Sequence, residues 1–250
     1  MTPLIHSLKR QLPENQVITD ELRRLAYGTD ASFYRLIPEV IAVVENEEEV
    51  QAVLHSARSH GRPVTFRAAG TSLSGQAITD GVLALIGEGF ATCEIAPDAA
   101  TVRLGPGMIG GEVNYRLAPL GRKIGPDPAS INACKIGGIS ANNASGMWCG
   151  TAQNSYRTLA GMRVVLADGT VLDTEDPFSI AAFRQSHAAL VGELDLLGRQ
   201  TRGDEALAAR IRHKFKIKNT TGYSLNALVD YTDPVDILAH LMIGSEGTLG

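Results

Sequence analysis

The chain has 250 residues, of which 44% are hydrophobic and 5% aromatic, and it contains 26 glycines. This composition is ordinary for a globular protein and excludes wholesale disorder, and the length fits one large domain or two small ones. Lys and Arg number 23 against 27 Asp and Glu, a formal net charge of −4, which argues against a nucleic-acid-binding protein. Cys93, Cys134 and Cys149 are widely separated and lack CxxC spacing, so they predict neither a disulfide scaffold nor a zinc or iron–sulfur site within this chain.

The sequence shows no targeting pattern. Residues 1–20 lack the apolar run of a signal peptide, and no uninterrupted apolar run reaches the roughly 18 residues of a membrane span. We therefore expect a cytoplasmic protein, and a peripheral position at the inner face of a membrane stays open. Residues 1–38 are expected to form a helical lead-in to the main domain.

The first clear unit of structure lies in residues 39–67. A β-branched run at residues 40–44 predicts a buried strand. Asn46 is expected to cap a helix whose first turn carries glutamates, which favour the positive end of the helix dipole, and Gly61 is expected to end it. Residues 63–67 predict a second buried strand, parallel to the first, because a helix connects the two in a βαβ unit.

The remaining elements mix strands and helices without strict alternation. Further strands are expected at residues 82–86, 101–104, 162–167 and 170–173, the last two joined by a hairpin turn at Asp168-Gly169. Helical patterns lie at residues 111–120, 177–215 and 233–242. Residues 213–218 alternate basic and apolar side chains, which indicates a solvated edge strand or a docking surface. This order favours an α+β fold over a regular doubly wound sheet.

The loop at residues 67–76 (RAAGTSLSGQ) has the composition of an anion-binding loop. Gly70 and Gly75 allow successive backbone N–H groups to turn inward, and Thr71, Ser72 and Ser74 add hydroxyl donors. Arg67 places a fixed positive charge nearby. The ending of a P-loop is missing, so hydrolysis of a nucleoside triphosphate is not indicated. From composition alone, a Ser/Gly-rich surface turn explains the segment equally well.

A second stretch, residues 125–151, is dominated by small side chains over about twenty positions. It is too apolar for a disordered linker, and small residues permit close approach of the backbone to a flat ligand. Asn142 and Asn143 offer donors and acceptors to such a ligand. Tight helix packing through Gly and Ala is the alternative explanation.

Residues 105–110 (GPGMIG) satisfy the dinucleotide-binding fingerprint G-x-G-x-x-G, but their context argues against it. Pro106 removes a backbone donor inside the fingerprint. The following helix is short, and Asp127 lies between prolines where a second strand has no room. We therefore do not expect a Rossmann nicotinamide site.

Other catalytic motifs are not present in the sequence. The six histidines lack metal-ligand spacing, and no serine is framed as G-x-S-x-G, so neither a metal site nor a hydrolase is predicted. Cys134 and Cys149 are interpreted as small packing residues. No catalytic base can be named from this chain.

Five motifs in order carry a resemblance to a known family. They are residues 63–75 (PVTFRAAGTSLSG), 126–128 (PDP), 136–146 (IGGISANNASG), 164–170 (VVLADGT) and 244–250 (GSEGTLG). Together they resemble the FAD-binding domain of the vanillyl-alcohol oxidase/p-cresol methylhydroxylase superfamily. The most similar branch contains FAD-linked D-lactate, glycolate and D-2-hydroxyglutarate dehydrogenases. The resemblance covers residues 39–250.

The resemblance implies an α+β, non-Rossmann fold with two subdomains, at about residues 39–95 and 98–250, with FAD extended between them. Residues 69–75 would wrap the pyrophosphate, Gly137, Gly138, Asn142 and Gly146 would line the flavin and its ribityl chain, and Val164 and residues 244–247 would lie near the adenine or the isoalloxazine edge. The expected FAD contacts are Arg67, Ala69, Gly70, Thr71, Ser72, Leu73, Ser74, Gly75, Gln76, Pro126, Asp127, Gly137, Gly138, Ser140, Asn142, Asn143, Gly146, Gly150, Thr151, Val164, Gly244, Glu246 and Gly247.

The resemblance also implies a chemistry and partners. Some relatives attach FAD covalently through a His in the first loop, but Thr71 follows Gly70 here, so noncovalent FAD is expected. Trp148 and Cys149 depart from the family pattern, while Gly150 and Thr151 fit it. A cap domain holding the small 2-hydroxyacid substrate and the catalytic base would lie outside this chain, as would an iron–sulfur or quinone acceptor, and the domain is expected to be cut shortly before its end. A homodimer is a further expectation.

Three functions stay open at this stage. The first is the FAD-binding module of a dehydrogenase that moves hydride from a D-2-hydroxy acid to the flavin. The second is a non-catalytic FAD-binding or electron-transfer subunit completed by another chain. The third is a reductase of a cell-wall precursor, which the Pro-Asp-Pro and Ser-Glu-Gly-Thr motifs disfavour.

Overall fold

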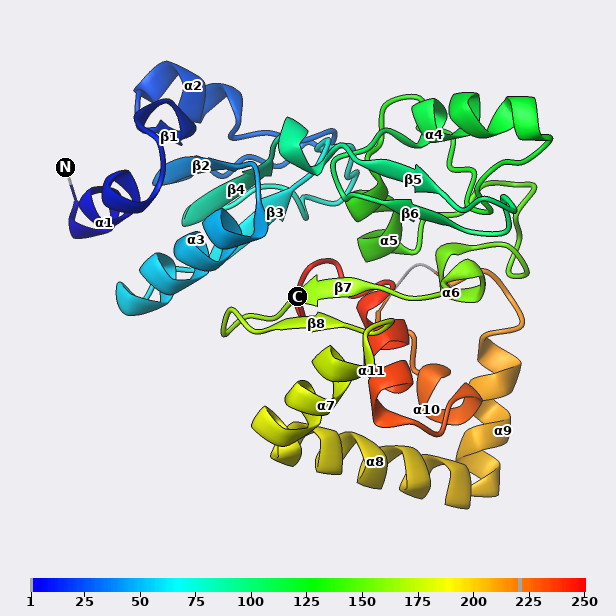
Figure 1. The fold of residues 1–250 in the computed structure, drawn as a ribbon. Coiled ribbons are helices and arrows are strands. Elements are labelled where there is room, and N and C mark those ends of the chain that lie inside the picture. The colour runs from blue at the N-terminus through cyan, green and yellow to red at the C-terminus, as the bar shows by residue number, and fades with distance from the viewer. Residues whose placement is uncertain (1, 220–221) are drawn as a thin grey trace. The chain divides into compact units, whose positions relative to one another are not determined.

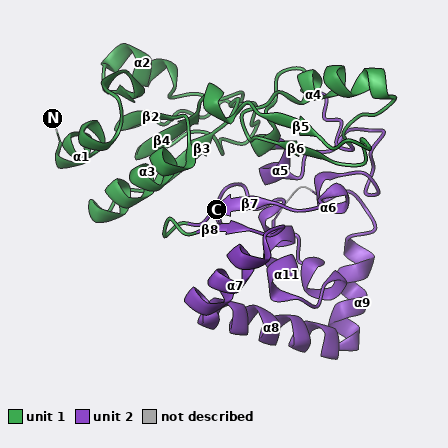
Figure 2. Ribbon diagram, viewed as in Figure 1, with its two compact units in different colours: residues 1–124, 130–138, 167–170 green, residues 125–129, 139–166, 171–250 purple. Residues whose placement is uncertain are grey.

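The computed structural model describes residues 2–219 and 222–250. The chain forms two compact units (Figure 2). Unit 1 comprises residues 1–124, 130–138 and 167–170, and unit 2 comprises residues 125–129, 139–166 and 171–250. Each unit is a set of residues that contact one another more than they contact the rest of the chain. The subdomain boundaries expected from the sequence stay a prediction.

The sheet of unit 1 has the strand order β1-β2-β4-β3 (Figure 1). Its strands are β1 (Val17–Ile18), β2 (Val40–Val44), β3 (Val64–Arg67) and β4 (Val82–Ile86). Both β2 and β3 pair in parallel with β4, so the parallel βαβ unit expected from the sequence is confirmed. The expectation that residues 63–67 are buried is wrong: β4 occupies the centre of the sheet and leaves β3 half-buried at its edge.

Helix α3 (Glu47–Ser59) connects β2 to β3 and packs on the sheet. It begins as predicted, because the Asn46 side chain accepts a hydrogen bond from the amide of Glu49. The residues before β2 belong to the same unit. They form α1 (Pro3–Gln11), the 3-10 turn η1 (Glu14–Gln16), β1 and α2 (Glu21–Ala26). Helix α1 packs against α3, and β1 adds an antiparallel strand to β2, so residues 1–38 contain a strand as well as helices.

The second part of unit 1 contains η2 (Glu88–Phe90), β5 (Cys93–Ile95), β6 (Val102–Leu104), α4 (Gly110–Leu117) and η3 (Ala118–Leu120). Gly121 ends this helical segment with φ +66°, in agreement with the helical pattern expected at residues 111–120. Within residues 2–219 and 222–250, strand β6 pairs only with β5, in an antiparallel hairpin. A Rossmann fingerprint needs a parallel βαβ context, so the structure confirms that residues 105–110 are not such a site.

Unit 2 is mainly helical around a small hairpin. It contains α6 (Ser155–Thr158), β7 (Arg163–Val165), β8 (Val171–Asp173), α7 (Pro177–Ser186), α8 (Ala188–Gly203), α9 (Glu205–Lys214), α10 (Ala227–Asp230) and α11 (Pro234–Met242). Helix α5 (Ile136–Asn142) begins in unit 1 and ends in unit 2. The expected hairpin and helices are present, and Phe183, Leu172 and Ile237 lie at the centre of the core. The edge strand considered for residues 213–218 is wrong, because His213 and Lys214 end α9 and the next residues are irregular.

The fold is therefore α+β and non-Rossmann. Among the described residues, no helix combines the length and the apolar character required to cross a bilayer.

Candidate functional site

In unit 1, the loop at residues 67–76, here called the glycine loop, contains two glycines with left-handed backbone. Gly70 has φ +68° and Gly75 has φ +79°, a conformation that residues with a side chain rarely adopt. A Cβ atom at Gly70 would also lie 2.5 Å from Arg67 nitrogens. Glycine at these two positions therefore lets the loop take this path without backbone strain or a close contact with Arg67.

The donor groups of this loop are largely unpartnered in the described chain. The backbone N–H groups of residues 69–73 and of Gly75 donate to no described residue, nor do the hydroxyls of Thr71 and Ser74 have a partner there. Ser72 differs, since its Oγ donates to Gln76 Oε1 and accepts from the amides of Ser74 and Gln76. Neighbouring N–H donors next to left-handed residues suit a phosphate group.

Arg67 has a role that the sequence did not indicate. Its Nη1 donates to the carbonyl oxygens of Tyr27 (3.2 Å) and Thr29 (2.7 Å), so part of its guanidinium binds the preceding segment. Burial lowers the pKa of Arg67, and the nearby Asp30 carboxylate acts in the opposite direction. The Nε and Nη2 atoms still lie beside Gly70, so the positive charge remains at the loop.

Gly137 and Gly138 differ in their surroundings in unit 1. The Gly137 amide donates to the Pro106 carbonyl, and a Cβ at Gly137 would lie 2.9 Å from the Pro106 side chain. This glycine therefore permits close packing on the turn after β6. A Cβ at Gly138 would meet only Ala68, at 3.9 Å, which places Gly138 near the start of the glycine loop.

In unit 2, Asp127 holds the loop at residues 146–149. Its Oδ1 accepts hydrogen bonds from the amides of Gly146 (2.9 Å) and Cys149 (3.3 Å). Desolvation raises the pKa of Asp127, but hydrogen bonds from Cys149 and Gly146 outweigh it and hold the pKa below its ordinary value. Cys149 is buried, in agreement with a packing role, while Met147 and Trp148 are 94% and 85% exposed. Pro126, also predicted at the site, is buried beside Asp127.

The end of α5 and the turn at residues 244–247 lie together, although they are far apart in sequence. The amide of Gly244 donates to the Ser140 carbonyl (3.1 Å), and the amide of Glu246 donates to Ala141 (2.8 Å). The Asn142 side-chain amide donates to Glu246 Oε1 at 2.6 Å. Burial raises the pKa of Glu246, and the hydrogen bond from Asn142 opposes this increase. Four residues predicted from separate motifs are thus brought together.

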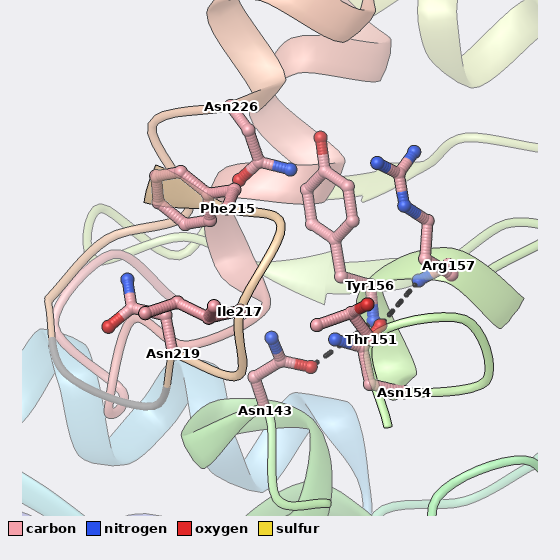
Figure 3. A pocket seen from close by; sticks show the side chains of 9 residues that line it. All are labelled: Asn143, Thr151, Asn154, Tyr156, Arg157, Phe215, Ile217, Asn219 and Asn226. Atoms are coloured by element: carbon pink, nitrogen blue, oxygen red, sulfur yellow. Dashed lines mark hydrogen bonds between the residues drawn. The ribbon is translucent and has the colours of Figure 1, made fainter. Parts of the chain in front are cut away.

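Asn143 and Thr151 line a small polar pocket in unit 2, of about 20 Å³ (Figure 3). Asn143 has φ +50°, and its Oδ1 accepts from the amide of Tyr156 (3.3 Å). The Tyr156 hydroxyl donates to Asp230 (3.0 Å), and burial, followed by the charge of Asp230, raises the pKa of this tyrosine. Asn226 Oδ1 is buried and has no hydrogen-bond partner among the described residues.

The remaining predicted residues lie at the edges of these groups. Val164, in β7, contacts the core of unit 2. Gly150 and Gly247 have positive φ, and no described atom lies within 4 Å of a Cβ added at either glycine. Leu73 is 76% exposed, while Ala69 is half-buried. Of the predicted FAD contacts, residues 67–76, Gly137 and Gly138 belong to unit 1, and the others belong to unit 2.

Sequence reasoning missed two residues that shape these loops. Lys218 Nζ donates to the Ser145 carbonyl at 2.5 Å, within the Asn-Asn-Ala-Ser-Gly motif. Asp30 accepts from the amide of Ala77, at the end of the glycine loop. Lys218 lies in the basic run, whose alternation suggested a strand instead, and Asp30 precedes the first recognised strand.

Known proteins with similar sequences include oxidoreductases that act on 2-hydroxy acids. D-2-hydroxyglutarate dehydrogenase of Escherichia coli is 26% identical over 98% of this chain and 25% of its own length. The glycolate oxidase subunit GlcD of E. coli is 30% identical over 68% of this chain and 35% of its own length. The chain thus spans about a quarter to a third of these curated relatives.

Among solved structures, BBE-like 1 of Physcomitrella patens matches with a TM-score of 0.60 and 19% identity, over 69% of this chain and 38% of the other. This likeness supports the two-subdomain, non-Rossmann fold. The family described as "FAD binding domain" matches residues 38–175, more than half of the chain. The chain therefore belongs to the FAD binding domain family, and FAD is its cofactor.

Proposed function

We propose that this chain is the FAD-binding part of an oxidoreductase that oxidises a D-2-hydroxy acid of the D-lactate, glycolate or D-2-hydroxyglutarate type. The glycine loop of unit 1 binds the pyrophosphate through the amides of residues 69–73 and 75 and the hydroxyls of Thr71 and Ser74. Gly137, Gly138, Asn142 and Gly146 line the flavin and its ribityl chain, and residues 244–247 with Val164 lie near the adenine or the isoalloxazine edge. Asn143, Gly150 and Thr151 are further contacts of the cofactor.

One observation carries this proposal: the row of N–H groups without described partners between two left-handed glycines. A pyrophosphate carries several acceptor oxygens and needs such a concentration of donors. The contact of Ser140 and Asn142 with residues 244 and 246 adds support, because it joins motifs that sequence reasoning assigned to one cofactor.

The residues of this chain bind and orient the cofactor. FAD, when bound, supplies the hydride acceptor for oxidation of the hydroxyl-bearing carbon. The substrate carboxylate and the catalytic base belong to parts of the enzyme outside this chain, in line with the share of the relatives that it spans. In the same proposal, an iron–sulfur centre or a quinone accepts the electrons from the flavin, and the enzyme forms a homodimer.

The cofactor is held noncovalently, since Thr71 stands where some relatives carry a His for attachment. The enzyme acts in the cytoplasm, with a peripheral position at the membrane as the alternative.

A second candidate is a non-catalytic FAD-binding or electron-transfer subunit completed by another chain. The E. coli relative GlcD is a subunit of glycolate oxidase, and this favours the second candidate. The two candidates share the cofactor and differ in whether substrate oxidation occurs on the same polypeptide.

Purification of the chain and an absorbance spectrum test the shared part. We expect a yellow protein with two visible flavin bands and full release of FAD on acid precipitation. A colourless chain that takes up no added FAD would contradict FAD binding, and flavin left on the precipitate would contradict noncovalent attachment. Anaerobic flavin bleaching by a panel of D-2-hydroxy acids, measured with the full-length protein, distinguishes the enzyme from the subunit.

A further inference from the structure

A segment outside the matched family region holds the glycine loop. Residues 27–34 precede residue 38, where the match to the FAD binding domain family begins. They nevertheless contact the start and both glycines of the loop at residues 67–76, and also Ala77, which follows it. We propose that this segment, here called the brace, pre-forms the loop for its phosphate ligand, and that Asp30 is its central positioning residue. This inference rests on the proposed binding of the FAD pyrophosphate by the loop.

The brace fixes the beginning of the loop through Arg67. The Arg67 Nη1 atom donates to the carbonyls of Tyr27 (3.2 Å) and Thr29 (2.7 Å), and the guanidinium lies 5.4 Å from the centre of the Tyr27 ring. The amide of Ala31 donates to the Gly70 carbonyl at 3.1 Å. The backbone of the first left-handed glycine is therefore tied directly to the brace.

The brace also fixes the end of the loop. Asp30 Oδ2 accepts from the amide of Ala77 at 3.3 Å, just after the loop. The Tyr34 ring lies against the second left-handed glycine, since a Cβ at Gly75 would be 3.1 Å from Tyr34 Cδ2. Both ends of the loop are thus attached to one short segment.

Asp30 connects the two attachments. Its Oδ1 accepts from the amide of Ser32 at 2.8 Å, which shapes the brace, while Oδ2 reaches Ala77. The carboxylate also lies near the charge of Arg67, which offsets the negative charge that it would otherwise present to a phosphate. Because both oxygens serve backbone amides of the protein, Asp30 acts through the loop and does not touch the ligand.

Within the described chain, the loop has few bonds of its own. Its internal side-chain bonds all involve Ser72, and the amides proposed to bind phosphate have no described partner. A loop of this kind loses conformational freedom when it binds a ligand, unless other contacts have already fixed it. The brace supplies those contacts, so its loss should weaken binding even though no ligand contact is removed.

The test compares Asp30→Ala with Asp98→Ala in the purified 250-residue chain. Asp98 is a matched control, because its Oδ1 also accepts from the amide two residues ahead (Ala100, 3.0 Å) but it does not contact the loop. We expect Asp30→Ala to raise the Kd for FAD roughly tenfold, the effect of one lost hydrogen bond to a charged acceptor, and Asp98→Ala to leave it unchanged. Flavin fluorescence titration measures both.

Hydrogen exchange of the FAD-free chain provides a readout that does not depend on the cofactor. Amides of residues 68–77 should exchange faster in Asp30→Ala than in the wild type, and should be unchanged in Asp98→Ala. Wild-type Kd for Asp30→Ala, or unchanged exchange in the loop, would each overturn the proposal. A wild-type chain that binds no FAD would instead contradict the proposed function, while the exchange data would still report on the brace.

If Asp30→Ala does not fold, Asp30→Asn replaces it with nearly the same volume. The Asn side chain has one acceptor oxygen for two amides, and its nitrogen would face an N–H group, so the same direction of change is expected. Equal binding and exchange in Asp30→Asn and the wild type would overturn the role of the Asp30 carboxylate.

Discussion

The glycine loop of unit 1 and the paired turns of unit 2 reach left-handed backbone in different ways. In the unit 1 loop, the residues with positive φ are Gly70 and Gly75. In unit 2, residues with side chains also adopt it: Asn143 has φ +50° and Glu246 has φ +56°. A side chain in this conformation costs about 1–2 kcal/mol per residue. Glycine gives the first loop its shape, whereas the second region needs further bonds to keep its shape.

Those bonds are visible around both strained residues of unit 2. Asn143 Oδ1 accepts from the amide of Tyr156, and Glu246 receives a hydrogen bond from Asn142 while its own amide donates to Ala141. Strained non-glycine residues persist where the surrounding structure fixes them, and they gather at functional sites. The unit 1 loop therefore depends on glycines, which lack a Cβ atom, whereas the unit 2 turns depend on hydrogen bonds made by their side chains.

We expect the largest loss of stability from a glycine of unit 2, which shows that this unit also depends on a glycine. A Cβ at Gly146 would lie 1.9 Å from the Asp127 carbonyl oxygen, and backbone must move to admit it. We expect Gly146→Ala to lower the free energy of unfolding by about 3 kcal/mol. Chemical denaturation measures this free energy. Gly192→Ala in helix α8 is the control, because no described atom lies within 4 Å of a Cβ added there. Equal stability of the two variants would show that the Asp127 contact is not tight.

A smaller effect should sharpen the contrast within unit 1. Gly70 and Gly61 both have positive φ (+68° and +62°). A Cβ at Gly70 would meet the side chain of Arg67, whereas no described atom lies within 4 Å of a Cβ at Gly61. Gly61→Ala should lower stability by about 1 kcal/mol and leave FAD affinity unchanged. Gly70→Ala should lower stability by about 2 kcal/mol, since the clash adds to the backbone strain, and should weaken FAD binding. Equal FAD affinity in both variants would argue against the loop as the phosphate site.

This contrast also explains what the sequence could predict. The βαβ unit, the Asn46 cap and the hairpin at residues 163–173 follow from local patterns, and the structure contains them. Strand β3 was misjudged because its apolar residues read the same at the edge and at the centre of a sheet. The order of strands depends on β4, which follows later in the chain.

The same limit applies to the site. Sequence reasoning identified Gly70 and Gly75 because they lie in a Ser/Gly-rich loop directly after a strand, and both have positive φ. The hydrogen bonds of Asp30 to Ala77 and of Lys218 to Ser145 join residues 47 and 73 positions apart, and nothing local marks them. The contact of Asp127 with the cofactor stays a prediction, and sequence reasoning did not foresee that its carboxylate also accepts hydrogen bonds from the amides of residues 146 and 149.

The smallest expected effect concerns the charge on Glu246. Burial raises its pKa above 4.5, and the hydrogen bond from Asn142 opposes this increase. The folded chain therefore binds this proton more tightly than the unfolded chain does. The contribution of protonated Glu246 to stability is fully present below pH 4.5, and it is lost as the pH rises through the higher pKa of the folded chain.

Glu246→Gln isolates this effect, because Gln keeps the oxygen that accepts from Asn142 and cannot ionise. From pH 4.5 towards neutrality, the stability of the Gln variant should rise relative to the wild type. The change should stay below about 1 kcal/mol, since solvent screens a half-buried carboxylate. Denaturation at a series of pH values measures it. Asn142→Ala removes the bond that lowers the pKa and should steepen the pH dependence. A Gln variant that follows the wild type at every pH would mean that Glu246 is held by its backbone alone, and the turns of unit 2 would then resemble the glycine loop more than the structure indicates.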